Sequence, residues 1–281
     1  MNRIVKKEKL AENITRIVLD APLIAQKAQA GQFVILRPTE ASERIPLTVA
    51  DTERDAGLLT LIFQTVGRST AELEALGEGD FVQNLAGPLG RASEFEGMKK
   101  VAVIGGGLGC AIAFPQAKAL HERGAEVDMI AGFRNSSLII LEKEMKEVSA
   151  SLTVVTDDGS NGKKGLVTDA LRERIEAGAK YDTVIAIGPP VMMKFVSLLT
   201  KEYGIRTVVS MNPIMIDGTG MCGGCRLTVG GRVKFACVDG PDFDGHQVDF
   251  DELIRRNNMY RAEEKEAFER YHTCNLYKNV D

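Results

Sequence analysis

The sequence predicts an antiparallel β-barrel, then a doubly wound α/β domain with a parallel sheet, then a C-terminal cysteine loop and helix. Short β-rich runs separated by turn residues fill residues 1–97, which is typical of a small barrel. Strands alternate with helical segments over residues 98–212, as in doubly wound sheets. Three of the five cysteines lie in a glycine-rich stretch within residues 213–281. We therefore expect three domains with these boundaries.

Length, composition and charge fit a globular protein and disfavour some partners. With 281 residues, of which 44% are hydrophobic and 26% charged, the chain is long enough for two or three domains. A net charge of −4 does not favour nucleic acid or an anionic membrane as a partner. The N-terminus has no apolar signal core, and the uncharged runs are too short or too rich in Gly and Pro to span a membrane. Few, unevenly spread cysteines indicate a reducing compartment, so we expect a cytoplasmic protein.

The first segment contains runs that we expect to be strands, at 13–22, 31–38, 44–52, 57–66 and 79–90. Arg44 and Thr48 share a face of the third run, because they are an even number of positions apart. The cation can pair with a phosphate, and the hydroxyl can hydrogen-bond to a flat ring system. Gly67, Ser69 and Thr70 can form an anion cradle before a helix. A surface arginine and a plain helix cap are the alternatives.

The second segment alternates strand and helix. Strands are expected at 99–106, 125–133, 151–159, 181–190 and 205–211, and helices at 109–123, 166–177 and 191–203. Leu138, Leu141, Met145 and Val148 recur at helical spacing and predict a further helix. Ligands of such sheets bind where the strands end.

A glycine loop, "VAVIGGGLGCA", joins the first strand and helix of the second segment. Gly106, Gly107 and Gly109 let the backbone approach a phosphate at a helix N-terminus, which predicts nucleotide binding; a tight turn without a ligand is the alternative. In the dinucleotide-binding pattern G-x-G-x-x-G/A, Cys110 takes the third glycine position. We interpret it as a small helix residue; a role beside a nicotinamide is the alternative. No acidic residue ends the next strand, where Arg134 follows instead. "IGPP" around Gly188 offers a second such loop.

The cysteine stretch reads D-x4-C-x2-C-x11-C, with Asp217, Cys222, Cys225 and Cys237 in the four slots. Plant-type [2Fe–2S] proteins use C-x4-C-x2-C…C, so aspartate stands in the first ligand position. A carboxylate is a harder ligand than a thiolate but can bind ferric iron. Completion by His246 or Cys274, a zinc site, and a loop without metal are the alternatives.

These motifs resemble the ferredoxin–NADP reductase superfamily, in which a barrel binds flavin and an α/β domain binds a nicotinamide nucleotide. The hydroxyl here falls four positions after the Arg, which departs from the R-x-x-[ST] pattern of the family. The resemblance implies an FAD site formed by Arg44, Ile45, Pro46, Leu47, Thr48, Gly67, Ser69 and Thr70, with Thr48 beside the flavin ring. It implies an NAD(H) site formed by Gly106, Gly107, Gly109, Gly188, Pro189 and Met192, with Arg134 and Asp157 near it. "LAGPLG" and "TDDGSNGKKG" are further landmarks.

With "DGTGMCGGCR" and the tail "DFDELIRRNNMYRAEEKEA", the chain resembles the small subunits of NADH-dependent reduced ferredoxin:NADP oxidoreductases. This implies a subunit that exchanges hydride between NAD(H) and FAD and single electrons with the [2Fe–2S] cluster. It also implies a large flavoprotein partner with FAD and [4Fe–4S] clusters, through which ferredoxin and NADP(H) react by electron bifurcation. The electron-transfer subunit of dihydroorotate dehydrogenase B, a subunit of a sulfide or polysulfide dehydrogenase, and a zinc-stabilised binding module are the alternatives.

Overall fold

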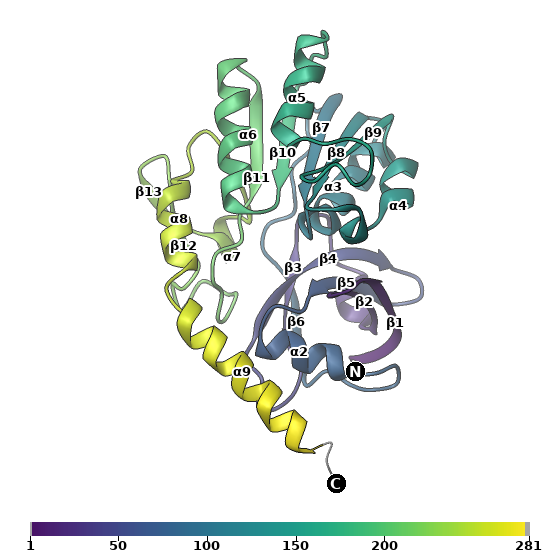
Figure 1. Ribbon diagram of the computed structural model, residues 1–281, viewed down its shortest axis with the longest axis vertical. Helices are drawn as coiled ribbons and strands as arrows, with labels where there is room; N and C mark the ends of the chain where they lie inside the picture. Colours follow the sequence, from purple (N-terminus) through teal and green to yellow (C-terminus); the bar gives the residue numbers. More distant parts are fainter. Residues whose placement is uncertain (1, 279–281) are drawn as a thin grey trace.

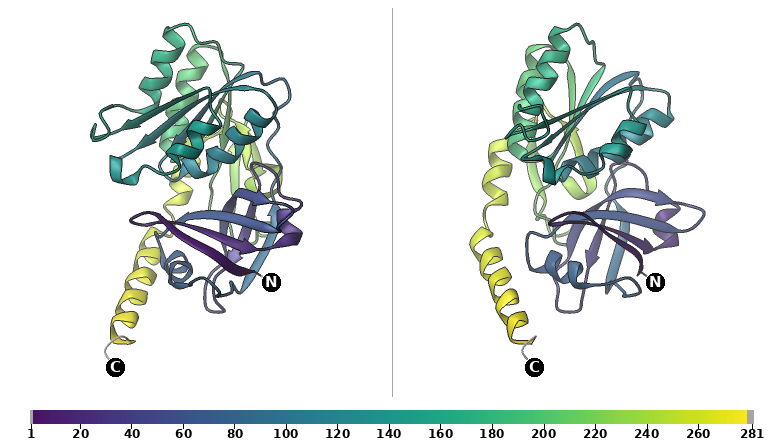
Figure 2. Two further views of the ribbon diagram at one scale, coloured as in Figure 1. Left: turned by 90° about the vertical axis from the view of Figure 1, so that its right-hand side faces the viewer. Right: turned by 45° about the vertical axis from the view of Figure 1, so that its right-hand side comes forward.

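The computed structural model describes residues 2–278, without the side chains at 272 and 274–278. Two six-stranded sheets follow one another along its longest axis, with the first sheet built from the N-terminal residues (Figure 1). The C-terminal residues run back along both sheets and end beside the first one (Figure 2). The predicted order of barrel, α/β domain and C-terminal segment is confirmed.

The first sheet is antiparallel and almost closed. Its strands are β1 (Arg3–Ala11), β2 (Ile14–Asp20), β3 (Phe33–Arg37), β4 (Ile45–Glu53), β5 (Leu58–Gln64) and β6 (Asn84–Leu89), in the order β1-β2-β5-β4-β3-β6. A bridge between Arg3 and Phe81 joins the two edges, which gives the barrel. The short helix α1 (Pro22–Ala25) and α2 (Arg68–Ala75) lie on it. Buried aliphatic side chains such as Ile17, Leu36 and Leu61 fill its interior.

The second sheet is parallel apart from one edge. It contains β7 (Lys100–Gly106), β8 (Glu126–Phe133), β9 (Ser151–Thr156), β10 (Thr183–Ile187), β11 (Arg206–Ser210) and β14 (Asp242–Asp244), in the order β14-β11-β10-β7-β8-β9. The helices α3 (Gly109–Glu122) and α4 (Glu142–Glu147) share one core with it, and α5 (Val167–Glu176) and α6 (Pro190–Glu202) share another. The strand order reverses between β7 and β10, which is where such sheets bind ligands.

The helix expected over residues 138–148 is shorter than the pattern indicated. Ser136–Leu138 forms a 3-10 turn, and α4 begins only at Glu142 because Leu141 has a left-handed φ of 56°. Leu141 and Met145 are nevertheless buried. The apolar spacing therefore identified the buried side but not the helix bounds.

The C-terminal segment builds a small unit of its own and also completes the second sheet. It contains the hairpin β12 (Arg226–Val229) and β13 (Arg232–Phe235), then α7 (Ala236–Asp239), α8 (Phe250–Asn257) and α9 (Arg261–Lys278). The acidic stretch after the hairpin contains β14, which pairs antiparallel with β11. The helix α9 packs beside α2 of the barrel (Figure 2). In the part of the chain that the structure describes, no helix is both long and apolar enough to cross a membrane.

Candidate functional site

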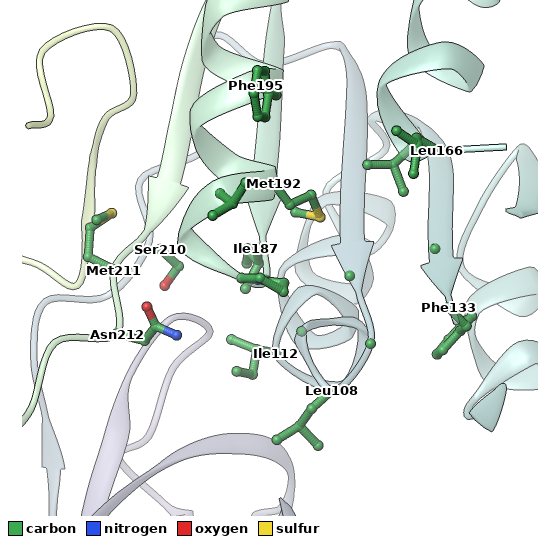
Figure 3. Close-up of a pocket in the computed structure, with 18 of the residues that line it drawn as sticks. Leu108, Ile112, Phe133, Leu166, Ile187, Met192, Phe195, Ser210, Met211 and Asn212 are labelled. Atoms are coloured by element: carbon green, nitrogen blue, oxygen red, sulfur yellow. The ribbon is translucent and has the colours of Figure 1, made fainter. Parts of the chain in front are cut away.

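A cavity of about 1170 Å³ lies between the barrel and the carboxyl ends of the second sheet. Such a volume exceeds the roughly 300–1,000 Å³ of a pocket for one small molecule, so there is room for two. In Figure 3 the first turn of α3, the end of β8, the start of α6 and the end of β11 surround this space. The predicted residues that line it are Pro46, Leu47, Thr48, Gly106, Gly107, Gly109, Arg134, Asp157, Gly188, Pro189 and Met192.

The barrel wall of the cavity comes from β3 and β4. Thr48 pairs with Phe33 across the two strands, and both line the cavity. Arg44, Ile45, Gly67, Ser69 and Thr70 are not among the lining residues, although the Glu43 amide donates to Ser69 Oγ at 3.3 Å. The Arg44 segment and the first turn of α2 are therefore neighbours at the barrel edge, beyond the main cavity.

Two glycines of the nucleotide wall, Gly106 and Gly109, have no room for a side chain. A Cβ on Gly109 would lie 2.3 Å from the carbonyl oxygen of Ile187, and one on Gly106 would lie 2.4 Å from Met192 Sδ. Gly107 has a φ of +55° and faces open space. The loop thus brings α3 tightly against the end of β10 and leaves bare backbone at the cavity, which fits a phosphate group.

A carboxylate and a guanidinium lie at the edge of the nucleotide wall. Asp157 follows β9, and its amide donates to the Phe133 carbonyl at 3.0 Å, beside Arg134. A carboxylate from the residue after β9 thus lies beside the end of β8, where the sequence itself has no acidic residue. A carboxylate at this edge can accept the hydroxyls of a ribose.

Of the two interpretations of Cys110, the structure favours a small helix residue over a role beside a nicotinamide. Its side chain is fully buried, it does not line the cavity, and its Sγ would lie 2.7 Å from a Cβ on Gly105. Burial raises the pKa of its thiol to about 12, so the thiol stays neutral. Cys110 is a packing residue of α3.

Replacement of Cys110 by alanine is accordingly expected to leave the rate of flavin reduction by NADH unchanged within about twofold. Loss of a small buried side chain is expected to lower the free energy of unfolding by about 1 kcal/mol. Stopped-flow reduction by NADH and a thermal melt measure the two effects. A rate loss of tenfold or more with an unchanged melt would restore the catalytic interpretation.

The hairpin brings two of the cysteines together. Gly230 and Gly231 have φ values of +57° and +72°, as a tight hairpin turn requires, and β12 and β13 pair from Arg226 with Phe235 onward. Cys225 precedes the first strand of the hairpin and Cys237 follows the second, so both lie at its open end. Their sulfurs are 3.2 Å apart. Burial, and then Cys225, raise the pKa of the Cys237 thiol to about 12. A pair of buried thiols ionises readily only beside a positive charge such as a metal.

Asp217 and Cys222 form the other half of the loop. The Asp217 carboxylate accepts the amides of Thr219 at 2.8 Å and Cys222 at 2.9 Å. The Thr219 amide lowers the pKa of Asp217, which keeps the carboxylate anionic. Cys222 is exposed, and its sulfur accepts the Gly224 amide at 3.4 Å.

The four predicted ligands are therefore joined two by two: the sulfurs of Cys225 and Cys237 are in contact, and the Asp217 carboxylate binds the backbone amide of Cys222. Within residues 2–278 as described, no three His, Cys, Asp or Glu side chains converge as a single-ion site. A carboxylate and three thiols, arranged two and two on a glycine-rich loop, fit a cluster with two irons. Of the alternative ligands, His246 instead lies 3.1 Å from Thr200 Oγ1 on α6, and the side chain of Cys274 is outside the described residues.

The cysteine loop rests on the barrel strand that forms the cavity wall. Gly218 has a φ of +75°, and a Cβ there would lie 2.7 Å from Ile35 Cγ1 and 3.0 Å from Leu89 Cδ1. Ile35 is two positions after Phe33, which lines the cavity, so both lie on one face of β3. The cysteine loop and the cavity thus contact neighbouring side chains on the same face of β3.

Substitution of Gly218 by alanine is expected to lift the loop off the barrel and release bound iron. Gly97→Ala is the matched control, because Gly97 has the same φ of +75° but no neighbour within 4 Å. Both changes carry the cost of a left-handed alanine, about 1–2 kcal/mol. Only Gly218→Ala should lower the iron content. Equal iron loss in both variants would show that backbone strain, not the contact with Ile35, is responsible.

One part of the cavity wall was not predicted. Ser210 ends β11, Met211 and Asn212 follow it, and all three line the cavity next to α3 (Figure 3). The available signal was their position after a parallel strand, where ligands gather. They also lead directly into the cysteine loop, and Asn257 Nδ2 of α8 donates to the Asn212 carbonyl at 3.3 Å.

Comparison with known proteins matches two parts of the chain to families. Residues 103–198 match the oxidoreductase NAD-binding domain, and residues 212–249 match the iron-sulfur cluster binding domain of dihydroorotate dehydrogenase B. The predicted nucleotide domain and iron–sulfur segment are thereby confirmed. The chain is an oxidoreductase subunit.

Two curated relatives and one solved structure cover nearly the whole chain. A dihydroorotate dehydrogenase B (NAD(+)) electron transfer subunit homolog of Thermotoga maritima is 48% identical over 96% of this chain and 95% of its own length. The electron transfer subunit of Streptococcus mutans is 34% identical over 88% and 97%. A chain from the structure of an NADH-dependent reduced ferredoxin-NADP oxidoreductase, studied for flavin-based electron bifurcation, superposes with a TM-score of 0.91 at 47% identity, over 96% of this chain and 98% of its own length.

Proposed function

The chain belongs to the family of dihydroorotate dehydrogenase B electron transfer subunits and their homologues, and on this premise we propose that it is the NAD(H)-side subunit of an electron-bifurcating NADH-dependent reduced ferredoxin:NADP oxidoreductase. The observation that carries the proposal is one cavity shared by a barrel wall and a nucleotide wall, with the cysteine loop packed on the same face of β3 that lines the cavity. The similarity to a bifurcating oxidoreductase chain supports the choice within the family.

The residues divide between two ligands. Pro46, Leu47 and Thr48 would lie along the flavin of FAD, and Arg44 with the first turn of α2 would hold its phosphates at the barrel edge. Gly106, Gly107, Gly109, Gly188, Pro189 and Met192 would hold NAD(H), with Asp157 on a ribose and Arg134 beside it. The domain boundaries at 97/98 and 212/213 remain part of this proposal.

Flavin accepts a hydride as two electrons and releases single electrons, which a [2Fe–2S] cluster can take. This chain's part is to hold the two ring systems against each other, exclude water from between them, and place Thr48 where it can hydrogen-bond a ring atom. Asp217, Cys222, Cys225 and Cys237 would hold the cluster. The apolar side chains of Ile216 and Met221, which are 55% and 88% exposed, would then face the large flavoprotein subunit.

A dihydroorotate dehydrogenase B electron-transfer role is the second candidate, because curated relatives carry that name. Aspartate in the first ligand position favours the bifurcating enzyme. A sulfide or polysulfide dehydrogenase would use the same small subunit, and the identity of the large subunit that co-purifies decides among the three.

The absorption spectrum of the anaerobically purified chain tests the proposal. We expect two flavin bands with a broad [2Fe–2S] shoulder, and we expect NADH to bleach the flavin band faster than NADPH. A colourless protein with stoichiometric zinc would refute the redox function. Equal rates with both nucleotides would refute only the assignment to NAD(H).

A further inference from the structure

Two ion pairs join the barrel to the helices of the second sheet. Asp51 on β4 accepts Lys118 Nζ of α3 through both carboxylate oxygens, at 2.8 and 2.9 Å. Arg16 on β2 donates to Glu144 on α4 at 2.7 Å. The other ion pairs found among the described side chains do not cross between the barrel and this sheet.

The strand that carries Asp51 also forms part of the barrel wall of the cavity. Thr48 lines the cavity, and Asp51 follows three positions later on the same strand, roughly 10 Å away at 3.3 Å per residue. The pairing of β4 with β5 is irregular between Val49 and Asp51. Such a bulge bends a strand and redirects the side chain that follows. Here that side chain is the carboxylate that reaches α3.

The helix that carries Lys118 also forms part of the nucleotide wall of the cavity. Gly109 and Ile112 of α3 line the cavity, and Lys118 follows on the same helix, roughly 14 Å beyond Gly109 at 1.5 Å per residue. The helix packs against β4. Gln116, in between, donates to Asp242 of β14 at 3.2 Å, which fixes the helix to its own sheet. A shift of β4 relative to α3 therefore moves Thr48 relative to Gly109.

We propose that the Asp51–Lys118 ion pair, assisted by Arg16–Glu144, is a positioning contact that sets how closely the two walls of the cavity hold their ligands. This rests on the proposed function, in which hydride passes between those walls. The side chains of Lys118 and Asp51 are 34% and 40% exposed, so the pair adds little to stability. A displacement of about 1 Å between reacting groups can nevertheless cost a rate of the order of 100-fold.

Charge-removal variants test the proposal through the rate of flavin reduction by NADH. Lys118→Met and Asp51→Asn are each expected to slow it by about tenfold or more, with unchanged FAD content and a similar melting temperature. The exchanged pair Asp51→Lys with Lys118→Asp is expected to recover part of the rate. Lys100→Met is the matched control, because Lys100 is also 34% exposed and its 2.6 Å pair with Glu126 stays within the second sheet.

A second readout does not depend on activity. Small-angle scattering of the purified chain without nucleotide should give a larger radius of gyration for the double variant Arg16→Met with Lys118→Met, and an unchanged one for Lys100→Met. Wild-type rates in Lys118→Met, an equal slowing in Lys100→Met, or unchanged scattering of the double variant would each overturn the proposal. A wild-type flavin that NADH does not reduce would instead refute the proposed function, and the scattering would still decide whether the ion pairs set the domain arrangement.

Discussion

Replacement of Asp217 by alanine is expected to remove most of the bound iron while FAD stays in place. The carboxylate already lies beside Cys222, whose amide it accepts at 2.9 Å, in the first slot of the ligand pattern. Loss of a residue that merely supports a metal ligand costs roughly 10–100-fold in metal affinity, and loss of a ligand should cost at least as much. Iron and sulfide analysis together with flavin absorbance of one sample measures both cofactors. Full iron occupancy with an unchanged EPR signal would exclude Asp217 as a ligand.

Two further variants separate ligation from loop capping. Asp217→Asn keeps an oxygen that can accept the Thr219 and Cys222 amides but lacks the negative charge, so it should lose iron like the alanine variant. Asp182→Asn is the control, because Asp182 also accepts two amides, from Lys99 at 2.9 Å and Lys100 at 2.8 Å, far along the chain from the loop. It should keep its iron. If Asp217→Asn keeps its iron as well, the role of Asp217 is to accept the loop amides of Thr219 and Cys222, not to bind iron.

Asp217→Cys adds the complementary result. It restores the four-cysteine pattern of plant-type clusters, and we expect it to keep the cluster with an altered EPR signal, because a thiolate is a softer ligand than a carboxylate. A variant that folds but binds no iron would mean that position 217 does not reach the cluster.

The cysteine loop was predictable because its signals are local. The spacing predicts Asp217 as the first ligand, and the structure places its carboxylate at the backbone amide of Cys222. The long gap between Cys225 and Cys237 closes because Gly230 and Gly231 turn the hairpin back on itself. The glycine loop followed the same logic, since a strand, a tight turn and a helix are adjacent in the sequence.

Elements that depend on distant partners were not predictable in the same way. The strand β1 is rich in charged residues and only Ile4 of it is buried, so it lacks the apolar alternation of a strand and is held by pairing with β2. The strand β14 has only three residues, and it exists because β11 offers a free edge. For the same reason the sequence did not place Ser210–Asn212 in the cavity wall or pair Asp51 with Lys118. Cys110 was assigned a possible role by its position in a motif, whereas packing against Gly105 decides it.

Replacement of Gly109 by alanine is expected to abolish reduction by NADH while FAD and the iron–sulfur cluster stay bound. The new Cβ would lie 2.3 Å from the carbonyl oxygen of Ile187 and 2.7 Å from Gly188 Cα, and neither backbone atom can move freely. The first turn of α3 must therefore shift away from β10. We expect a stability loss of about 1–3 kcal/mol and a rate loss of about 100-fold, because the nucleotide is then misplaced against the flavin.

The contrast with Gly77→Ala makes this result specific. Gly77 lies in the barrel, needs no left-handed φ, and its Cβ would meet only Asp80 Oδ2, at an ordinary 3.6 Å. It should retain its rate of reduction by NADH. Reduction by dithionite should remain intact in both variants, because a chemical reductant does not use the glycine loop. If Gly109→Ala is reduced by NADH at the wild-type rate, the nucleotide does not bind against the first turn of α3. If it is slow with dithionite as well, the defect lies in the flavin or the barrel. Slow reduction by NADH alone would assign the glycine loop to the nucleotide, since the bare backbone at Gly107 and the close contact at Gly109 belong to the same turn.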